Sequence, residues 1–220
     1  MSNIFNTEDI IRSIPSGRVL VIVEGYEMVG KSTLVKELVT DLKSSDDSLI
    51  IHTSSYLNHD IGSLIGYDNL YSSALIISDI VKNSNMSDVV VVQDRGLRSS
   101  LFYPHNNMLD DQVDNNSIIS KYYKSYDTII VLTLSLSDVN NNLFSLCNNS
   151  RDNKKFDPSS EIEYLENYNK FYNLSDDIIT RSTKVYRNSC NLIEINIKND
   201  YKIDNQKKEE ENESKISKLS

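Results

Sequence analysis

The chain has 220 residues, 39% hydrophobic and 25% charged, which is typical of a globular protein with a substantial core. Asp and Glu total 32 against 23 Lys and Arg, and the formal net charge of −9 argues against binding to nucleic acid or anionic membranes, whose phosphates would be repelled. With only two cysteines and three histidines in no spaced set, the composition excludes a disulfide framework and a zinc site of four thiolates.

No apolar run approaches the roughly 18 residues that a membrane-spanning helix needs. The longest aliphatic run is Val19–Val23. Residues 1–14 contain neither the basic region nor the apolar stretch of a secretory signal. We therefore expect a cytoplasmic protein.

Strand-like and helix-like segments alternate along the chain. Helical patterns occupy Thr7–Ile14, with Thr7 as the expected N-cap, and Ser32–Leu42, Leu70–Val81, Ser117–Tyr126, Asp138–Leu146 and Glu161–Tyr186. Apolar runs of strand length occupy Arg18–Glu24, Ser48–His52, Asp88–Gln93, Thr128–Leu134 and Leu192–Ile197. This alternation predicts an α/β fold of three layers, in which helices flank a central parallel sheet.

The domain organisation follows from a change in composition near the end of the chain. Residues 1–200 are predicted to form a single domain, interrupted by a polar loop at about 147–160. Residues 201–220 are polar and charged, with no apolar face over most of their length. We expect this segment to be a disordered tail or a frayed helix.

The strongest motif is GYEMVGKST, which fits GxxxxGK[ST] and lies between an apolar strand and an amphipathic helix. Glycines at its two fixed positions permit close backbone approach, so that successive N–H groups and the helix dipole face one anion. Lys31 supplies a cation for the β- and γ-phosphates, and Ser32 a hydroxyl ligand for Mg²⁺. The motif predicts a site for ATP and Mg²⁺ made by Gly25, Tyr26, Glu27, Met28, Val29, Gly30, Lys31, Ser32 and Thr33.

A second charged motif follows the strand at Asp88–Gln93. Asp94 at the carboxyl end of a buried parallel strand lies in the crevice where α/β sheets bind ligands. If that strand neighbours the first one, Asp94 lies near the Mg²⁺, and Arg95 and Arg98 face the same anionic crevice. The alternative is that Asp94 caps a following helix and that Arg95 makes a surface ion pair.

The segments VIVEGYEMVGKSTLVKEL and VVVVQDRGLRSSLFY together resemble the thymidylate kinase family of P-loop nucleoside monophosphate kinases. The resemblance is at the level of motifs and spans residues 18–197 in element order. It implies that Arg95 binds the acceptor phosphate, that Glu27 touches the acceptor sugar, that Tyr103 lies near the acceptor nucleotide, and that the chain forms a homodimer. The sequence departs from the family at Gly96, where an aromatic residue or His is usual.

The polar loop at 147–160 contains three cations, Arg151, Lys154 and Lys155, in an acidic protein. Phosphoryl transfer needs cations around the transferred group and exclusion of water, and a mobile basic lid supplies both. The resemblance places a lid here, and some family members carry their catalytic arginine in it. Arg151 is the first choice because a planar guanidinium bridges two phosphates, while the alternative is a solvated basic loop.

Three functions are compatible with these motifs. The first is Mg²⁺-dependent transfer of the ATP γ-phosphoryl group to a (deoxy)nucleoside monophosphate, a small-molecule partner. The second is a deoxynucleoside kinase, which needs a carboxylate base near the second strand, where residues 52–55 offer none and Asp60 is a remote candidate. The third is a nucleotide-binding module without turnover. For the first, the predicted catalytic residues are Lys31, Arg95 and Arg151, the substrate-binding residues Glu27, Arg95, Arg98 and Tyr103, and the metal ligands Ser32 and Asp94.

Overall fold

The computed structural model describes residues 6–26, 29–45, 49–53, 77–102, 121–136 and 176–199, together with residues 163, 166, 169 and 170. In these residues, five strands form one sheet in the order β2-β3-β1-β4-β5, and all neighbouring strands are parallel. The strands are β1 (Arg18–Glu24), β2 (Leu49–Thr53), β3 (Val89–Asp94), β4 (Thr128–Leu136) and β5 (Asn191–Asn199). The predicted α/β fold with a central parallel sheet is confirmed.

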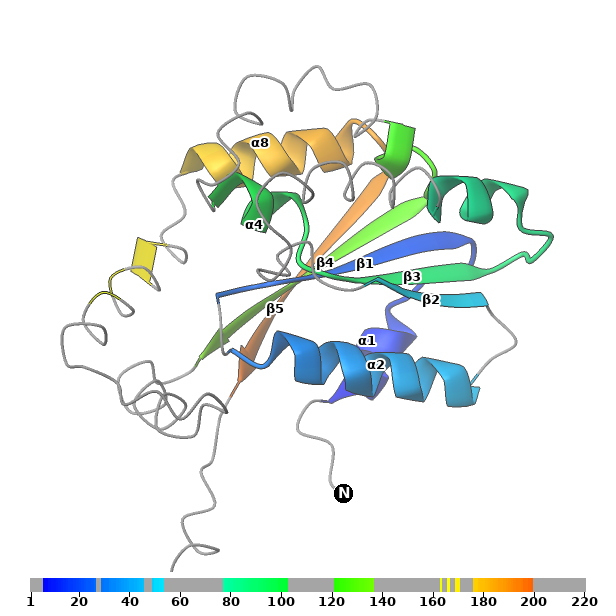
Figure 1. Ribbon diagram of the computed structural model, residues 1–220, viewed down its shortest axis with the longest axis horizontal. Coiled ribbons are helices and arrows are strands. Elements are labelled where there is room, and N and C mark those ends of the chain that lie inside the picture. The colour runs from blue at the N-terminus through cyan, green and yellow to red at the C-terminus, as the bar shows by residue number, and fades with distance from the viewer. Residues whose placement is uncertain are drawn as a thin grey trace, which may run out of the picture.

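Helices cover both faces of the sheet (Figure 1). On one face lie α1 (Thr7–Arg12) and α2 (Lys31–Ser45), and on the other lie α4 (Leu97–Phe102) and α8 (Asp176–Arg187). Residues 77–83 and 121–123 are also helical, in agreement with two of the predicted helices. All five strands lie within two residues of the predicted bounds, whereas α4 was not predicted.

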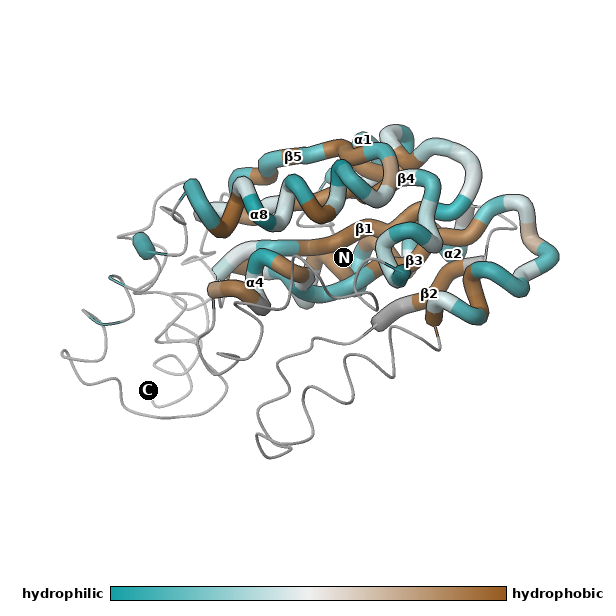
Figure 2. The backbone as a smooth tube through the Cα atoms, turned by 90° about the horizontal axis from the view of Figure 1, so that it is seen from above, coloured by the Kyte–Doolittle hydropathy of each residue, from teal (hydrophilic) through white to brown (hydrophobic). Residues whose placement is uncertain are grey.

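The sheet is buried on both sides because its central strands are continuously apolar. In β1, Val19, Val21 and Val23 belong to the core beneath α1 and α2, whereas Leu20 and Ile22 belong to the core beneath α8. Successive side chains of a strand point to opposite faces, so an unbroken apolar run is what two covered faces require. In Figure 2 the tube has hydrophobic colour along β1 and mixed colours along α8.

The start of α1 differs from the prediction. Asn6 occupies the N-cap position and makes no side-chain capping hydrogen bond, and Thr7 lies within the helix. The Thr7 hydroxyl instead donates a hydrogen bond to the carboxylate of Asp41 on α2. Thr7 therefore ties α1 to α2 rather than capping its own helix.

Several predicted segments lie outside the described residues: the helix at 138–146, the polar loop at 147–160 and the tail at 201–220. The same holds for most of residues 161–175, the first part of the helix predicted at Glu161–Tyr186. The single-domain organisation therefore stays a prediction. Among the described residues, no helix combines the length and the apolar character that crossing a membrane requires.

The turn before β1 is fixed by two carboxylates at the amino-terminal edge of the sheet. Asp88 accepts a hydrogen bond from the N–H of Gly17 at 2.6 Å, and Asp127 accepts one from the N–H of Arg18 at 2.9 Å. Gly17 has φ 107°, and a Cβ added there would lie 2.9 Å from Oδ2 of Asp127. The glycine is thus needed for both its conformation and its close approach.

We expect Gly17→Ala to lower the free energy of unfolding by about 1–2 kcal/mol, because alanine is strained at this φ and its methyl group displaces Asp127. Ser16→Ala, in the same turn at an exposed position, is the control and should change it by less than about 0.5 kcal/mol. Urea denaturation of the three proteins measures both values. Equal stability of Gly17→Ala and the unaltered chain would contradict the role given to this turn.

Candidate functional site

The phosphate-loop motif connects the carboxyl end of β1 to the start of α2. Gly25 and Gly30 have φ of 144° and 95°, values that favour glycine, and α2 begins at Lys31 directly after Gly30. The ammonium group of Lys31 donates a hydrogen bond to the carbonyl oxygen of Tyr26 and is buried. The Lys31 side chain therefore reaches from the end of the loop back to its beginning.

The remaining loop residues divide into those that pack and those that face outward. Tyr26 and Val29 are buried in the core beneath α2, which anchors both sides of the loop. Ser32 is exposed on the first turn of α2, and Thr33 is half-buried. Glu27 and Met28 lie outside the described residues, so their predicted contacts stay predictions.

Asp94 lies beside the loop because of the strand order. β3 pairs directly with β1, with Asp94 in register with Val23, as the sequence analysis required. The Ser32 hydroxyl donates a hydrogen bond to Oδ2 of Asp94 at 3.0 Å. Residues 62 positions apart in the chain are thus brought into contact at the carboxyl edge of the sheet.

The Ser32–Asp94 pair fits a hard divalent cation. Asp94 is 7% exposed, and its second oxygen, Oδ1, has no hydrogen-bond partner among the residues that the structure describes. A buried carboxylate oxygen without a donor is costly, and coordination of a cation removes that cost. A carboxylate and a hydroxyl next to a phosphate loop are the oxygen ligands through which proteins bind Mg²⁺ with nucleotides. In the described part of the chain no group of three or more His, Cys, Asp or Glu residues is placed to hold a metal ion.

Arg95 follows Asp94 in an unusual backbone conformation. Its φ is 67°, which lies in the left-handed region. Among the described residues, Arg95 is the only non-glycine residue with a positive φ. Its N–H donates to the carbonyl oxygen of Val23 at 2.9 Å, which extends the pairing of β3 with β1 by one residue. The side chain is buried, and its charge acts on the carboxyl of Glu24. Binding of an acceptor phosphate by Arg95 stays a prediction.

Glu24, the last residue of β1, holds the start of α4. Its Oε1 accepts hydrogen bonds from the N–H groups of Gly96 at 3.0 Å, Arg98 at 3.1 Å and Ser99 at 3.4 Å, and its Oε2 accepts one from the Ser99 hydroxyl. Burial raises the pKa of this carboxyl, and the Ser99 hydrogen bonds and the charges of Arg98 and Arg95 oppose that shift. Glu24 thus satisfies three of the backbone N–H groups at the start of α4, which have no partner within the helix.

Gly96 explains one departure from the thymidylate kinase pattern. A Cβ at this position would lie 2.6 Å from Cγ2 of Ile22, 3.1 Å from Oε1 of Glu24 and 3.3 Å from the hydroxyl of Tyr186. The same Tyr186 hydroxyl accepts a hydrogen bond from the N–H of Leu97 at 3.1 Å. A larger residue would separate α4 from both of its acceptors, so a residue without a side chain follows Arg95.

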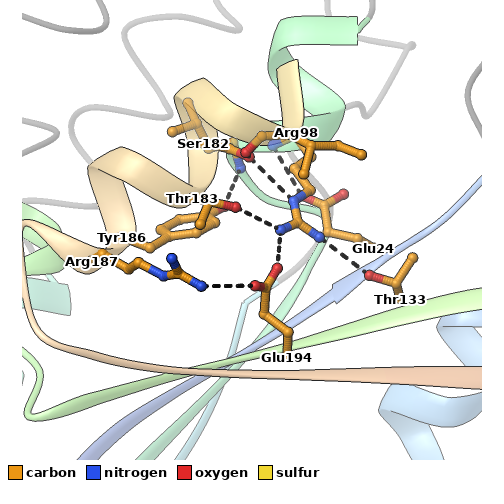
Figure 3. Close-up of polar contacts among 10 residues, drawn as sticks. Glu24, Arg98, Thr133, Ser182, Thr183, Tyr186, Arg187 and Glu194 are labelled. Atoms are coloured by element: carbon orange, nitrogen blue, oxygen red, sulfur yellow. Dashed lines mark hydrogen bonds and ion pairs between the residues drawn. The ribbon is translucent and has the colours of Figure 1, made fainter. Parts of the chain in front are cut away.

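Arg98 has a different environment from the one expected. Its guanidinium donates to the hydroxyls of Ser182 at 3.2 Å, Thr183 at 3.2 Å and Thr133 at 3.4 Å, and it forms an ion pair with Glu194 (Figure 3). These partners come from α8, β4 and β5. The guanidinium is therefore used within the protein, and a role for Arg98 in substrate binding stays a prediction that these contacts do not support.

Three residues that shape this region were not predicted to have a structural role: Glu24, Tyr186 and Glu194. Glu24 carried one signal, a carboxylate at the end of an otherwise apolar strand. For Tyr186 and Glu194 the sequence contained no such signal, because both are far along the chain from the residues that they contact, Leu97 and Arg98. Two other predicted residues, Tyr103 and Arg151, lie outside the described part of the chain.

No family model matches the chain, and no curated protein matches its sequence. Among solved structures, thymidylate kinase from Candida albicans is similar, with 13% identity, a TM-score of 0.41, and coverage of 84% of this chain and 85% of that one. Polyphosphate kinase 2 from Arthrobacter aurescens TC1 has 15% identity and a TM-score of 0.45 over 86% of this chain and 64% of that one. Identities this low do not tell what this chain binds.

The structural role of Arg98 can be separated from a binding role with two arginines that contact the same carboxylate. Arg98→Met leaves the partly buried Glu194 without its buried partner and should lower the free energy of unfolding by about 3 kcal/mol. Arg187→Met removes an exposed contact with Glu194 at 3.9 Å and should cost less than about 1 kcal/mol. Chemical denaturation compares them, and equal small losses would contradict the structural role.

Proposed function

We propose that this protein is a Mg²⁺- and ATP-dependent phosphotransferase whose acceptor is a nucleoside monophosphate. The observation that carries the proposal is the contact between Ser32 and Asp94, with Oδ1 of Asp94 lacking a donor in the described structure, beside a loop that holds a buried lysine. A phosphate loop alone serves many reactions. A metal-binding carboxylate on the strand next to that loop is the arrangement that phosphoryl transfer with a nucleoside triphosphate requires.

In the proposed mechanism, protein residues stabilise charge and position the reactants, and none of them forms a covalent bond to the transferred group. Lys31 exchanges the carbonyl of Tyr26 for oxygens of the β- and γ-phosphates, and the loop N–H groups bind the same phosphates. When bound through Ser32 and Asp94, Mg²⁺ neutralises negative charge on those phosphates. An oxygen of the acceptor phosphate forms a bond to the γ-phosphorus while the bond to the β–γ bridging oxygen breaks, which yields ADP and a nucleoside diphosphate.

Two cations complete the proposed site. Arg95 is assigned to the acceptor phosphate because it directly follows Asp94 at the carboxyl edge of the sheet. Arg151, in the segment 147–160, is assigned to the transferred group. A phosphate acceptor is already an anion, so this reaction needs no general base, which agrees with the lack of a carboxylate in the sequence that ends β2. The resemblance of the two motifs to thymidylate kinases supports a monophosphate acceptor.

The function is tested by measuring ADP release with a panel of nucleoside monophosphates and nucleosides. We expect turnover with at least one monophosphate, and Lys31→Ala should lower kcat/KM by about 100-fold or more because the phosphates lose their principal cation. Lys36→Ala, an exposed lysine on the same helix, is the matched control and should behave like the unaltered chain.

Two outcomes of that assay would overturn the proposal. Turnover with nucleosides alone would establish a deoxynucleoside kinase or a related enzyme. Tight ATP binding without transfer to any acceptor would establish a nucleotide-binding module.

The assignment of the metal predicts a specific defect in Asp94→Asn. The amide keeps an acceptor for Ser32 but loses the charge, so the Mg²⁺ concentration for half-maximal activity should rise about tenfold or more. ATP binding in the presence of EDTA should stay unchanged, which calorimetry measures. An equal loss of ATP affinity with and without Mg²⁺ would show that Asp94 does not act through the metal.

A further inference from the structure

Gln93 is an amide where the strand pattern calls for an apolar residue. It follows four buried valines, Val89–Val92, and is itself 0% exposed, in register with Ile22 on the face covered by α8. Burial of an amide is unfavourable unless its donor and acceptor groups are hydrogen-bonded. A buried strand residue of this kind therefore needs partners for both ends of its amide.

Both ends of the Gln93 side chain are used. The hydroxyl of Tyr122 donates to Oε1 of Gln93 at 2.8 Å, and Nε2 of Gln93 donates to the carbonyl oxygen of Arg95 at 2.8 Å. A carbonyl oxygen only accepts hydrogen bonds, so the NH₂ end of the amide must face Arg95. The contacts form a buried chain from Tyr122 through Gln93 to the backbone of Arg95.

This chain of contacts ends on the one non-glycine residue with a positive φ among those that the structure describes. Arg95 has a φ of 67°, its N–H donates to the carbonyl oxygen of Val23, and its own carbonyl oxygen accepts from Gln93. A non-glycine residue keeps such a conformation only where its surroundings fix it. Val23 fixes the amide side of Arg95, and Gln93 fixes the carbonyl side.

We propose that Gln93, oriented by Tyr122, is a positioning residue: it holds Arg95 in the left-handed conformation and thereby directs its guanidinium to the acceptor phosphate. The inference deepens the proposed function and rests on it for the role of Arg95 toward the acceptor. The backbone part of the inference does not depend on any activity. An apolar residue at position 93 would pack in the same place but leave the Arg95 carbonyl without its donor.

The backbone part is tested by crystal structures of Gln93→Met and Tyr122→Phe. Methionine is similar in length but cannot donate, so we expect Arg95 to leave the left-handed region in Gln93→Met. In Tyr122→Phe the amide loses its orienting donor, and Arg95 should populate two conformers. A positive φ of Arg95 as the single conformer in both variants would overturn the inference, whatever the enzyme does.

The functional part is tested by steady-state kinetics of the same variants. Gln93→Met should raise KM for the acceptor about tenfold or more and lower kcat, because a misdirected guanidinium no longer aligns the acceptor. Tyr122→Phe should raise this KM by a smaller factor. The dissociation constant of the non-hydrolysable Mg²⁺–ATP analogue AMP-PNP should change less than twofold in both, because the phosphate loop is untouched.

Tyr126→Phe is the matched control. Its ring lies in the same cluster, 5.4 Å from that of Tyr122, but its hydroxyl is not the donor to Gln93. It should leave both kinetic constants and the Arg95 conformation unchanged. Equal changes in Tyr122→Phe and Tyr126→Phe would indicate a packing role and overturn the inference.

The crystal structures and the kinetics can contradict the two parts of the inference independently. If the unaltered protein transfers phosphate to no acceptor, the proposed function and the positioning of an acceptor fail together, but the crystal structures still decide whether Gln93 fixes Arg95. If Arg95 changes conformation in Gln93→Met while KM for the acceptor stays the same, the positioning role fails and the proposed function remains.

Discussion

The parallel pairing of β1 with β3 is the constraint on which the site depends. Their apolar stretches, Val19–Val23 and Val89–Val92, are buried, so both strands lie inside the sheet, and their register places Asp94 beside Val23 where the phosphate loop begins. A shift of one residue would turn Asp94 to the other face of the sheet and break its contact with Ser32. The apolar cores on the two faces of the sheet therefore maintain the geometry of the polar edge.

The two arginines after β3 serve different purposes because of the turn between them. Arg95 is in the left-handed region, and α4 begins directly afterwards, at Leu97, with its N–H groups held by Glu24 and Tyr186. Arg98 consequently points to α8 and β5, where it forms an ion pair with Glu194. One arginine thus joins elements within the fold, and the other stays at the carboxyl edge, where we propose that it binds the acceptor.

The sequence was sufficient for the features that depend on local pattern. The five apolar runs predicted the strands, because a strand that is buried on both faces has apolar residues at successive positions. The motif GxxxxGK[ST] predicted the phosphate loop and the helix after it. The sequence was insufficient for features that depend on contacts between residues far apart in the chain. The six residues of α4, LRSSLF, are too few for a helical period to stand out, and the helix is capped by Glu24, 72 residues away from Gly96. The contacts of Arg98 could not be predicted for the same reason, because its partner Glu194 is 96 residues away.

The central claim is that the loop from Gly25 to Lys31 binds a triphosphate together with a divalent cation held by Ser32 and Asp94. Calorimetric titration of the unaltered protein with ATP, in Mg²⁺ and then in EDTA, tests it most directly. The account predicts saturable binding of one equivalent that is markedly tighter with Mg²⁺. Absence of a binding heat for ATP or any other purine triphosphate in Mg²⁺ would contradict it.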